Sequence, residues 1–504
     1  MKTTKLMRLL VLMLALCLLV GTFAACATEE EDGETVGDES TEGVGGTGGD
    51  DVIEDDLDEN GYLKDNLPED LNFDREIRIL YSTHQKKWVC VDEEGSAAGV
   101  VEEAIYTRWR DVEDRLGVEI LWVAEQGKWD SSKNTFIQMV ETNSSTGTAF
   151  DAVASYNLFP GAFASKGLAQ NLADTEYIEL DKPWWPAAYV EEAMVNDTIY
   201  GLVENSSRAT LCNLHGTFFN NSLIQAHGLT SPYEMVANNT WTFDNMMALI
   251  KDVGSDLNSN GTKDNDDYFG LVTGTKAKIE TWFFGMGYRY SQKSADGGIE
   301  LLMTDSDKMI EWIDRFNDAT STKDFLIHDS SHTKAFVEER AVLYMSSIQL
   351  VDSMIGKEIT MDYGVVPVPK GSESQERYIS NVANDHNAWS VPVNCYSMDE
   401  SSALIECMAS ESYRTVAPMY FETCVKLRYA PDERLFEMYD MIRDSITFDF
   451  CQIYSFVFAS GADPRALIQN CTSIGTANWA SQWANVGGTV ESGFAEILTL
   501  YGLG

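Results

Sequence analysis

Residues 100–123 read VVEEAIYTRWRDVEDRLGVEILWV and contain a helix, its end and a strand in one run. Apolar side chains recur at helical spacing over 100–116, which predicts a helix with one apolar face. Gly117 is typical of a helix end, and the run VEILWV at 118–123 favours a strand. A helix that leads directly into a strand indicates a sheet of the α/β class.

The flanking sequence extends the same alternation in both directions. A strand is predicted at 76–81 (EIRILY), and another at 150–154 (FDAVA) after a further helical pattern. Strands that alternate with helices imply parallel strands joined by right-handed crossovers. Later strands are predicted at 361–367 and 388–393. A chain of 504 residues is too long for one simple core, so we expect two lobes.

The N-terminus has the pattern of an export signal. Basic residues among the first eight precede an apolar run at 9–23, which is shorter than the ~20 residues of a membrane-spanning helix. We therefore expect residues 1–25 to be a cleaved signal peptide. The sequence FAAC at 23–26 resembles the lipobox of bacterial lipoproteins, which implies that Cys26 is lipidated. Ordinary signal cleavage beside an incidental cysteine is the alternative.

Acidic residues are concentrated in the next segment and outnumber basic residues in the whole chain. Residues 27–70 hold 18 acidic residues and one lysine, with few large apolar side chains, so 26–74 is predicted to be a disordered tether. The net charge of −44 argues against nucleic acid as a partner. Seven cysteines remain beyond Cys26, with no CxxC spacing, so neither a disulfide framework nor a zinc site is indicated.

Several segments from 75 to 504 together resemble the extracellular solute-binding proteins of ABC importers, family 1, which are maltose-binding-protein-like. Each is a loose motif, and their order and spacing carry the resemblance. They are FDAVASYNLFPGAFASKGLAQNL at 150–172, IYGL at 199–202, FNNS at 219–222, SPYE at 231–234, WTFD at 241–244 and DYGVVPVPK at 362–370.

The resemblance implies the two-lobed periplasmic-binding-protein type II fold. Each lobe would be a mixed sheet flanked by helices, with the ligand cleft between the lobes and closure by hinge bending. Lobe 1 would comprise 75–208 plus about 370–430, and lobe 2 about 209–369 plus 431–504. The segments 199–222 and 362–370 would be the crossovers between them.

The resemblance also implies a function. The protein would be a lipoprotein, anchored by acyl chains such as palmitate on the extracellular face of the cell membrane of a Gram-positive-type bacterium. It would bind a mono- or oligosaccharide as a monomer and deliver it to ABC permease subunits. Two alternatives stay open: a receptor of the same fold for a non-sugar ligand, and a surface glycoside hydrolase or adhesin. No GxSxG, HExxH or Walker sequence occurs, so we do not expect an enzyme.

Candidate ligand-binding residues come from predicted strand ends and crossovers. Sugar sites combine aromatic faces with carboxylates and amides that bind hydroxyl groups. For any single aromatic residue, packing in the core is the alternative. The candidates are Thr83, His84, Tyr156, Glu204, Trp282, Phe283, Ser346, Gln349, Asp385 and Trp389.

A loop at 256–267, DLNSNGTKDNDD, fits the spacing of an EF-hand calcium loop. Asp267 stands at the twelfth position in place of the usual Glu and reaches less far. A solvated Asn/Gly/Asp loop is the alternative. We expect a structural Ca²⁺ with ligands at Asp256, Asn258, Asn260, Thr262, Asp264 and Asp267.

Overall fold

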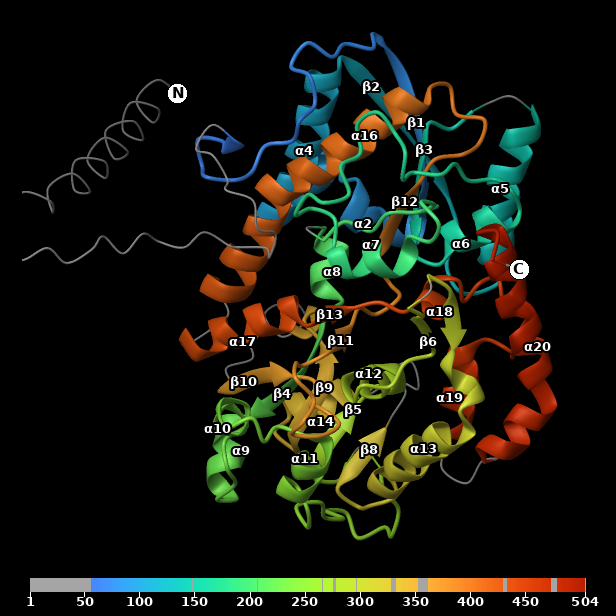
Figure 1. Ribbon diagram of the computed structural model, residues 1–504. Coiled ribbons are helices and arrows are strands. Elements are labelled where there is room, and N and C mark those ends of the chain that lie inside the picture. Colours follow the sequence, from blue (N-terminus) through green and yellow to red (C-terminus); the bar gives the residue numbers. More distant parts are fainter. Residues whose placement is uncertain are drawn as a thin grey trace, which may run out of the picture. The chain divides into compact units, whose positions relative to one another are not determined.

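The computed structural model describes residues 56–504, except 147–148, 206, 265, 275–277, 296, 328–331, 352–360, 429–432, 473–477 and 504 (Figure 1). The predicted signal peptide, the lipidation site Cys26 and the tether up to residue 55 lie outside the described residues. None of the helices in the described part has the length and apolarity that a membrane crossing requires.

The first sheet has the strand order β12-β3-β1-β2. Strand β1 (Arg75–Ser82) pairs in parallel with β2 (Val118–Glu125) and β3 (Ala152–Tyr156). Strand β12 (Asn387–Ser390) returns much later in the chain and pairs antiparallel with β3. The three strands predicted near the N-terminal end of the folded chain are confirmed, and the sheet is mixed.

Helix α4 (Val100–Leu116) connects β1 to β2 and ends as its sequence predicts. Its buried positions include Val101, Ile105, Val112 and Leu116, which form one apolar stripe. Gly117 follows with a φ of 60°, in the left-handed region that glycine adopts at low cost. The local sequence therefore determines both the face and the end of this helix.

The second sheet has the order β10-β4-β9-β5-β8. Strand β5 (Phe269–Thr273) pairs in parallel with β8 (Phe325–Ile327) and β9 (Ala341–Ser347). Strand β4 (His215–Asn220) pairs antiparallel with both β9 and β10 (Tyr363–Pro367). We call each sheet, with the helices that pack on it, the first and the second lobe.

The chain passes between the sheets at the predicted crossovers. It enters the second sheet through β4 and leaves it through β10, and these two strands lie side by side. It then forms β11 (Ser380–Asn381), which pairs with β13 (Ile446–Thr447), before it reaches β12 in the first sheet. On its way back to the first lobe the chain therefore takes part in two strand pairings, β10 with β4 and β11 with β13.

Helices cover both sheets (Figure 1). Helix α17 packs on β10, α16 packs on α4, and the C-terminal helix α20 contacts both α6 and α13. The remaining elements are α2 Lys86–Val89, α3 Glu93–Ser96, α5 Ser132–Thr146, α6 Phe159–Ser165, α7 Ala187–Ala193, α8 Arg208–Cys212, α9 Asn221–Ala226, α10 Pro232–Ala237, α11 Phe243–Leu249, α12 Ile279–Gly285, β6 Ser291–Lys293, β7 Ile299–Leu301, α13 Ser306–Thr320, α14 His332–Val337, α16 Met398–Glu411, α17 Glu433–Asp444, α18 Phe450–Ile453, α19 Pro464–Cys471 and α20 Trp479–Leu500, with short 3₁₀ turns and π-helical turns at Ser412–Val416 and Pro418–Arg428.

Residues 56–74 correct one sequence prediction, because they are not part of a disordered tether. We call them the N-terminal strap. Asp65 and Leu67 are buried, and Leu57 forms a backbone bridge with Leu63. The Asp65 carboxylate lies 2.5 Å from Arg115 and 3.1 Å from Arg414. The acidic composition suggested disorder, but the folded lobe supplies cations that pair with this carboxylate.

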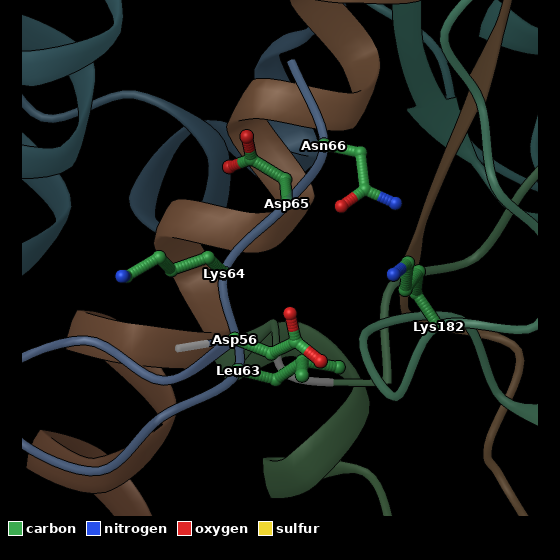
Figure 2. Close-up of a pocket in the computed structure, with 6 residues that line it drawn as sticks. All are labelled: Asp56, Leu63, Lys64, Asp65, Asn66 and Lys182. Atoms are coloured by element: carbon green, nitrogen blue, oxygen red, sulfur yellow. The ribbon is translucent and has the colours of Figure 1, made fainter. Parts of the chain in front are cut away.

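A pocket of about 330 Å³ lies beside the N-terminal strap. Figure 2 shows its lining: Asp56, Leu63, Lys64, Asp65 and Asn66 on the strap and Lys182 facing them from the first lobe. The Asn66 amide donates to both oxygens of Glu179, at 2.8 and 2.7 Å. The pocket therefore lies where the strap packs against the first lobe.

Candidate functional site

Loops at one edge of the first sheet bring several predicted residues together. Strands β1 and β3 are parallel and end at the same edge, where the polar side chains that follow them meet the chain entering β12. The His84 Nε2 lies 2.8 Å from the Asp385 Oδ1, and the Gln85 amide donates to the same oxygen at 3.1 Å. Tyr156 is the last residue of β3 and is buried. Thr83 is exposed beside His84.

The same edge collects buried polar atoms that have no hydrogen-bond partner within the described part of the chain. Asn387 pairs with Tyr156 across the β12–β3 ladder, which places these groups next to each other. Leaving such an atom unpaired costs about 1–3 kcal/mol, so we expect water or a ligand to supply the partners at this edge. The atoms are Gln85 Oε1, Ser155 Oγ, Asn157 Oδ1, His386 Nε2 and Asn387 Oδ1.

The second lobe and the C-terminal helices direct charged groups to the same place. Lys278 Nζ, at the start of α12, lies 2.6 Å from His215 Nε2 of β4. Glu280 accepts a hydrogen bond from the Tyr290 hydroxyl at 3.2 Å and lies 3.6 Å from Arg465 of α19. Both lobes therefore contribute ionisable side chains to one cluster.

The charges of these groups act on one another across the two lobes. Burial raises the pKa of Tyr156, while Arg465 opposes that rise through its charge and a hydrogen bond. Burial lowers the pKa of Lys278 to about 8, and the charge of Asp385 opposes this shift. Burial raises the pKa of Glu280 to about 7 against the charge of Arg465. We define Tyr156, Asp385, Lys278, Glu280 and Arg465 as the central cluster.

Glu204 and Trp389 interact with each other inside the first lobe. The Trp389 indole N–H donates to Glu204, and both side chains are buried. Leu202 and Trp389 also exchange two backbone hydrogen bonds, at 2.9 and 2.7 Å. Arg108 lies 3.9 Å from the same carboxylate. This pair joins the first crossover to β12 and supports the edge on which the cluster lies.

The two other predicted aromatic residues lie in the core of the second lobe. Trp282 and Phe283 are both fully buried. Trp282 contacts Phe243 and Phe325, and Phe283 packs against Trp312 and Tyr290 among others. Ser346 lies on β9 opposite Gly216, and Gln349 follows that strand half-buried. The core surrounds the two aromatic rings, so they contribute stability to the lobe.

Trp129 is a candidate that the sequence reading missed. It follows β2, whose end lies beside the end of β1 because Glu125 is paired with Ser82. Its side chain is 66% exposed, which is unusual for an indole. The signal was available in the sequence, because Trp129 follows the second strand as His84 follows the first. An exposed indole at this edge offers a flat face for stacking.

The predicted calcium loop is held by hydrogen bonds of its own. Asp256 accepts from the Gly261 N–H at 2.9 Å, and Asp267, which is buried, accepts from the Asp264 N–H at 3.0 Å. Asn260 accepts from the Thr262 N–H at 2.7 Å. Among the described residues, no group of three or more His, Cys, Asp or Glu side chains converges as a metal site.

No protein-family model and no curated protein matches the chain. Solved structures do match. The GacH receptor of Streptomyces glaucescens, solved unliganded and with acarbose, has a TM-score of 0.54 and 12% identity, over 84% of this chain and 99% of that one. The maltose/maltodextrin-binding domain MalE from Bdellovibrio bacteriovorus, bound to maltotriose, has a TM-score of 0.51 and 14% identity, over 83% and 100%.

A third match is the galacto-N-biose/lacto-N-biose I-binding protein of an ABC transporter from Bifidobacterium longum. It has a TM-score of 0.52 and 14% identity, over 85% of this chain and 98% of that one. All three structures are described as receptors or binding proteins. The match over nearly their full lengths shows that the chain has the two-lobed fold of maltose-binding-protein-like solute receptors, which confirms the predicted fold class.

Proposed function

We propose that this protein is a carbohydrate receptor of an ABC importer and not an enzyme. The observation that carries the proposal is the central cluster. It holds charged groups from both lobes. Beside its Tyr156 and Asp385 lie the polar atoms of the carboxyl edge that have no partner among the described residues. In an α/β sheet, ligands bind beyond the carboxyl ends of the strands. The fold, which it shares with the sugar-binding proteins named above, supports the same assignment.

A sugar fits the chemistry of this place. Its hydroxyl groups both donate and accept, so they can satisfy amide and hydroxyl groups such as those of Asn157, Asn387 and Ser155. The exposed face of Trp129 would cover the C–H face of a sugar ring. A ligand that contacts both lobes would shift the equilibrium toward their closed arrangement. His84, Asp385 and Tyr156 are the predicted residues that this proposal retains as ligand contacts.

A binding panel tests the proposal. The secreted form of the protein, without residues 1–25, would be titrated with mono- and oligosaccharides by calorimetry and thermal shift. A saccharide present at 100 times its Kd stabilises the folded protein by about 2.7 kcal/mol. We expect at least one saccharide to bind with a Kd in the micromolar range or below. Release of new reducing ends over time would instead favour a glycoside hydrolase. Absence of binding and of hydrolysis across the panel would contradict a sugar ligand.

Delivery to a permease at the membrane is the finer part of the proposal. It rests on the lipobox-like FAAC sequence, with Cys26 as the acylated residue. Two buried acyl chains at ~0.8 kcal/mol per methylene hold a protein firmly on a bilayer. The Cys26→Ala protein should appear in the culture medium while the unmodified protein sediments with membranes. A Cys26→Ala protein that stays with the membranes would contradict lipid anchoring.

We also propose that the 256–267 loop binds a structural Ca²⁺. Its Asp and Asn side chains follow the EF-hand spacing, and hard oxygen ligands suit this ion. Calorimetric titration with CaCl₂ after chelator treatment should show one site, which Asp256→Ala removes. Titration of Asp252→Ala, outside the loop, should match the unmodified protein. If the unmodified protein takes up no Ca²⁺, the proposal is wrong and the loop is a solvated turn.

A further inference from the structure

Lys278 is positioned as a charged donor rather than as a surface lysine. It is half-buried, and its ammonium group lies 2.6 Å from the Nε2 of His215. The other ring nitrogen, Nδ1, lies 3.1 Å from the carbonyl oxygen of Asn381, which can only accept. The proton of the neutral imidazole therefore belongs on Nδ1, and Nε2 accepts from Lys278. Burial and the Lys278 charge lower the pKa of His215 well below its usual value, so the ring stays neutral.

The cation on Lys278 has no anionic partner in the described part of the chain. No carboxylate there forms an ion pair with it, and the neighbouring positions 275–277 are Thr, Lys and Ala. The carboxylate that acts on Lys278 is Asp385, which is already ion-paired with His84 and bonded to Gln85. A desolvated charge is costly unless an opposite charge meets it. A ligand anion would meet this requirement.

The central cluster contains a second cation besides Lys278. Arg465 brings a second cation, and the pKa of its partner Glu280 is raised to about 7 by burial, so that carboxyl group is only partly ionised at neutral pH. The whole chain carries a net charge of −44. Two cations, from α12 and α19, therefore lie in one cluster of a strongly acidic protein. They point to an anionic ligand group.

We propose that Lys278 binds the carboxylate of an acidic sugar, so that the saccharide recognised by this receptor contains a uronate residue. This inference rests on the proposed carbohydrate function and names its substrate class. The polar atoms at the edge of the first sheet that have no partner among the described residues bind the hydroxyl groups of the same saccharide. Arg465, which lies beside Tyr156, adds long-range attraction for the carboxylate.

The test compares matched acidic and neutral ligands on the secreted form of the protein. Trigalacturonate and the galactotriose of the same linkage would be titrated by calorimetry at two salt concentrations. We expect trigalacturonate to bind at least 10-fold more tightly, and this preference to shrink at high salt. Lys278→Gln should lower affinity for trigalacturonate 10- to 100-fold and affinity for galactotriose less than 3-fold. Lys278→Arg should keep the preference for the acid.

Lys308→Gln is the matched control, because Lys308 is exposed on α13, and its binding should equal that of the unmodified protein. Circular dichroism verifies that Lys278→Gln is folded, and Lys278→Arg carries the test if it is not. Galactotriose binding as tight as trigalacturonate binding overturns the uronate inference and leaves the carbohydrate function standing. Equal losses for both sugars in Lys278→Gln also overturn it. Binding of no saccharide, acidic or neutral, overturns both proposals.

Discussion

Two of the charged clusters in the described part of the chain differ in how they affect the pKa of a buried carboxylate. Under the N-terminal strap, Asp65 is paired with Arg115 and Arg414 and accepts a hydrogen bond from Ser410 at 2.7 Å. These partners outweigh burial and hold the pKa of Asp65 at about 2. In the central cluster, burial outweighs the partners of Glu280 and raises its pKa to about 7.

The difference separates a structural ion cluster from a candidate ligand site. Around Asp65 the partners are complete, so the carboxylate stabilises the fold. Around Glu280 the nearest cation is 3.6 Å away, and neighbouring polar atoms have no partner in the described part of the chain. Ionisable groups with strongly shifted pKa values concentrate at functional sites, where a ligand can supply the missing charge or hydrogen-bond partners. The comparison can be tested at both clusters.

Removal of the Asp65 side chain should have the largest effect. Asp65→Ala removes the buried carboxylate that Arg115 and Arg414 share and leaves them only Glu411 as an anion in the described part of the chain. We expect this to lower the free energy of unfolding by about 3 kcal/mol at pH 7. The pKa of Asp65 is about 2 in the folded protein, below its usual 3.8. Its contribution is therefore present above pH 4 and is lost as the pH falls toward 2. Urea denaturation followed by tryptophan fluorescence measures both effects.

Asp70→Ala is the control for this change, because Asp70 is an exposed carboxylate of the same strap. It should alter the free energy of unfolding by less than about 0.5 kcal/mol. Ligand affinity should be the same in both variants. If Asp65→Ala were as stable as Asp70→Ala, the strap would not be held by this ion cluster.

Substitution of Glu280 should have a smaller effect of opposite sign. The folded pKa of Glu280, about 7, lies above its usual 4.5, so ionisation destabilises the folded state and stability falls as the pH rises through 7. Glu280→Gln cannot ionise, so its free energy of unfolding does not fall in this way. It should gain up to about 2 kcal/mol relative to the unmodified protein between pH 5 and pH 8. Glu300→Gln, an exposed control, should show no such gain. A difference that does not change with pH would place Glu280 with the structural carboxylates.

The smallest effect is expected at Trp129. Because its indole is exposed, Trp129→Ala should leave the free energy of unfolding within about 0.5 kcal/mol of the unmodified protein. Loss of the stacking face should cost about 1 kcal/mol of binding, which is roughly a 5-fold rise in Kd for the saccharide found by the panel. Tyr396 is 73% exposed beyond the far end of β12, and Tyr396→Ala serves as the control. Equal affinities in both variants would remove Trp129 from the site.

The candidate site was only partly predictable. His84, Tyr156 and Asp385 follow or precede strands, so their position could be inferred from the strand pattern alone. Lys278, Glu280 and Arg465 carry no comparable signal, because their role depends on contacts with residues of the other lobe. Trp282 and Trp129 show the same limit for aromatic residues. The local sequence of each is compatible with a place in the site. Only the tertiary packing shows that Trp282 is buried in the core and that Trp129 is exposed.

The sequence by itself determined the α/β class, the first three strands and the helix end at Gly117. These depend on local periodicity and on glycine at a left-handed position, which neighbouring residues are enough to specify. The tertiary structure decided the order of the N-terminal strap and the membership of the central cluster. Asp65 is ordered by arginines 50 and 349 residues away, and no local pattern records a partner at such separations. Composition indicated a free acidic tether there, and folding placed its charge against cations.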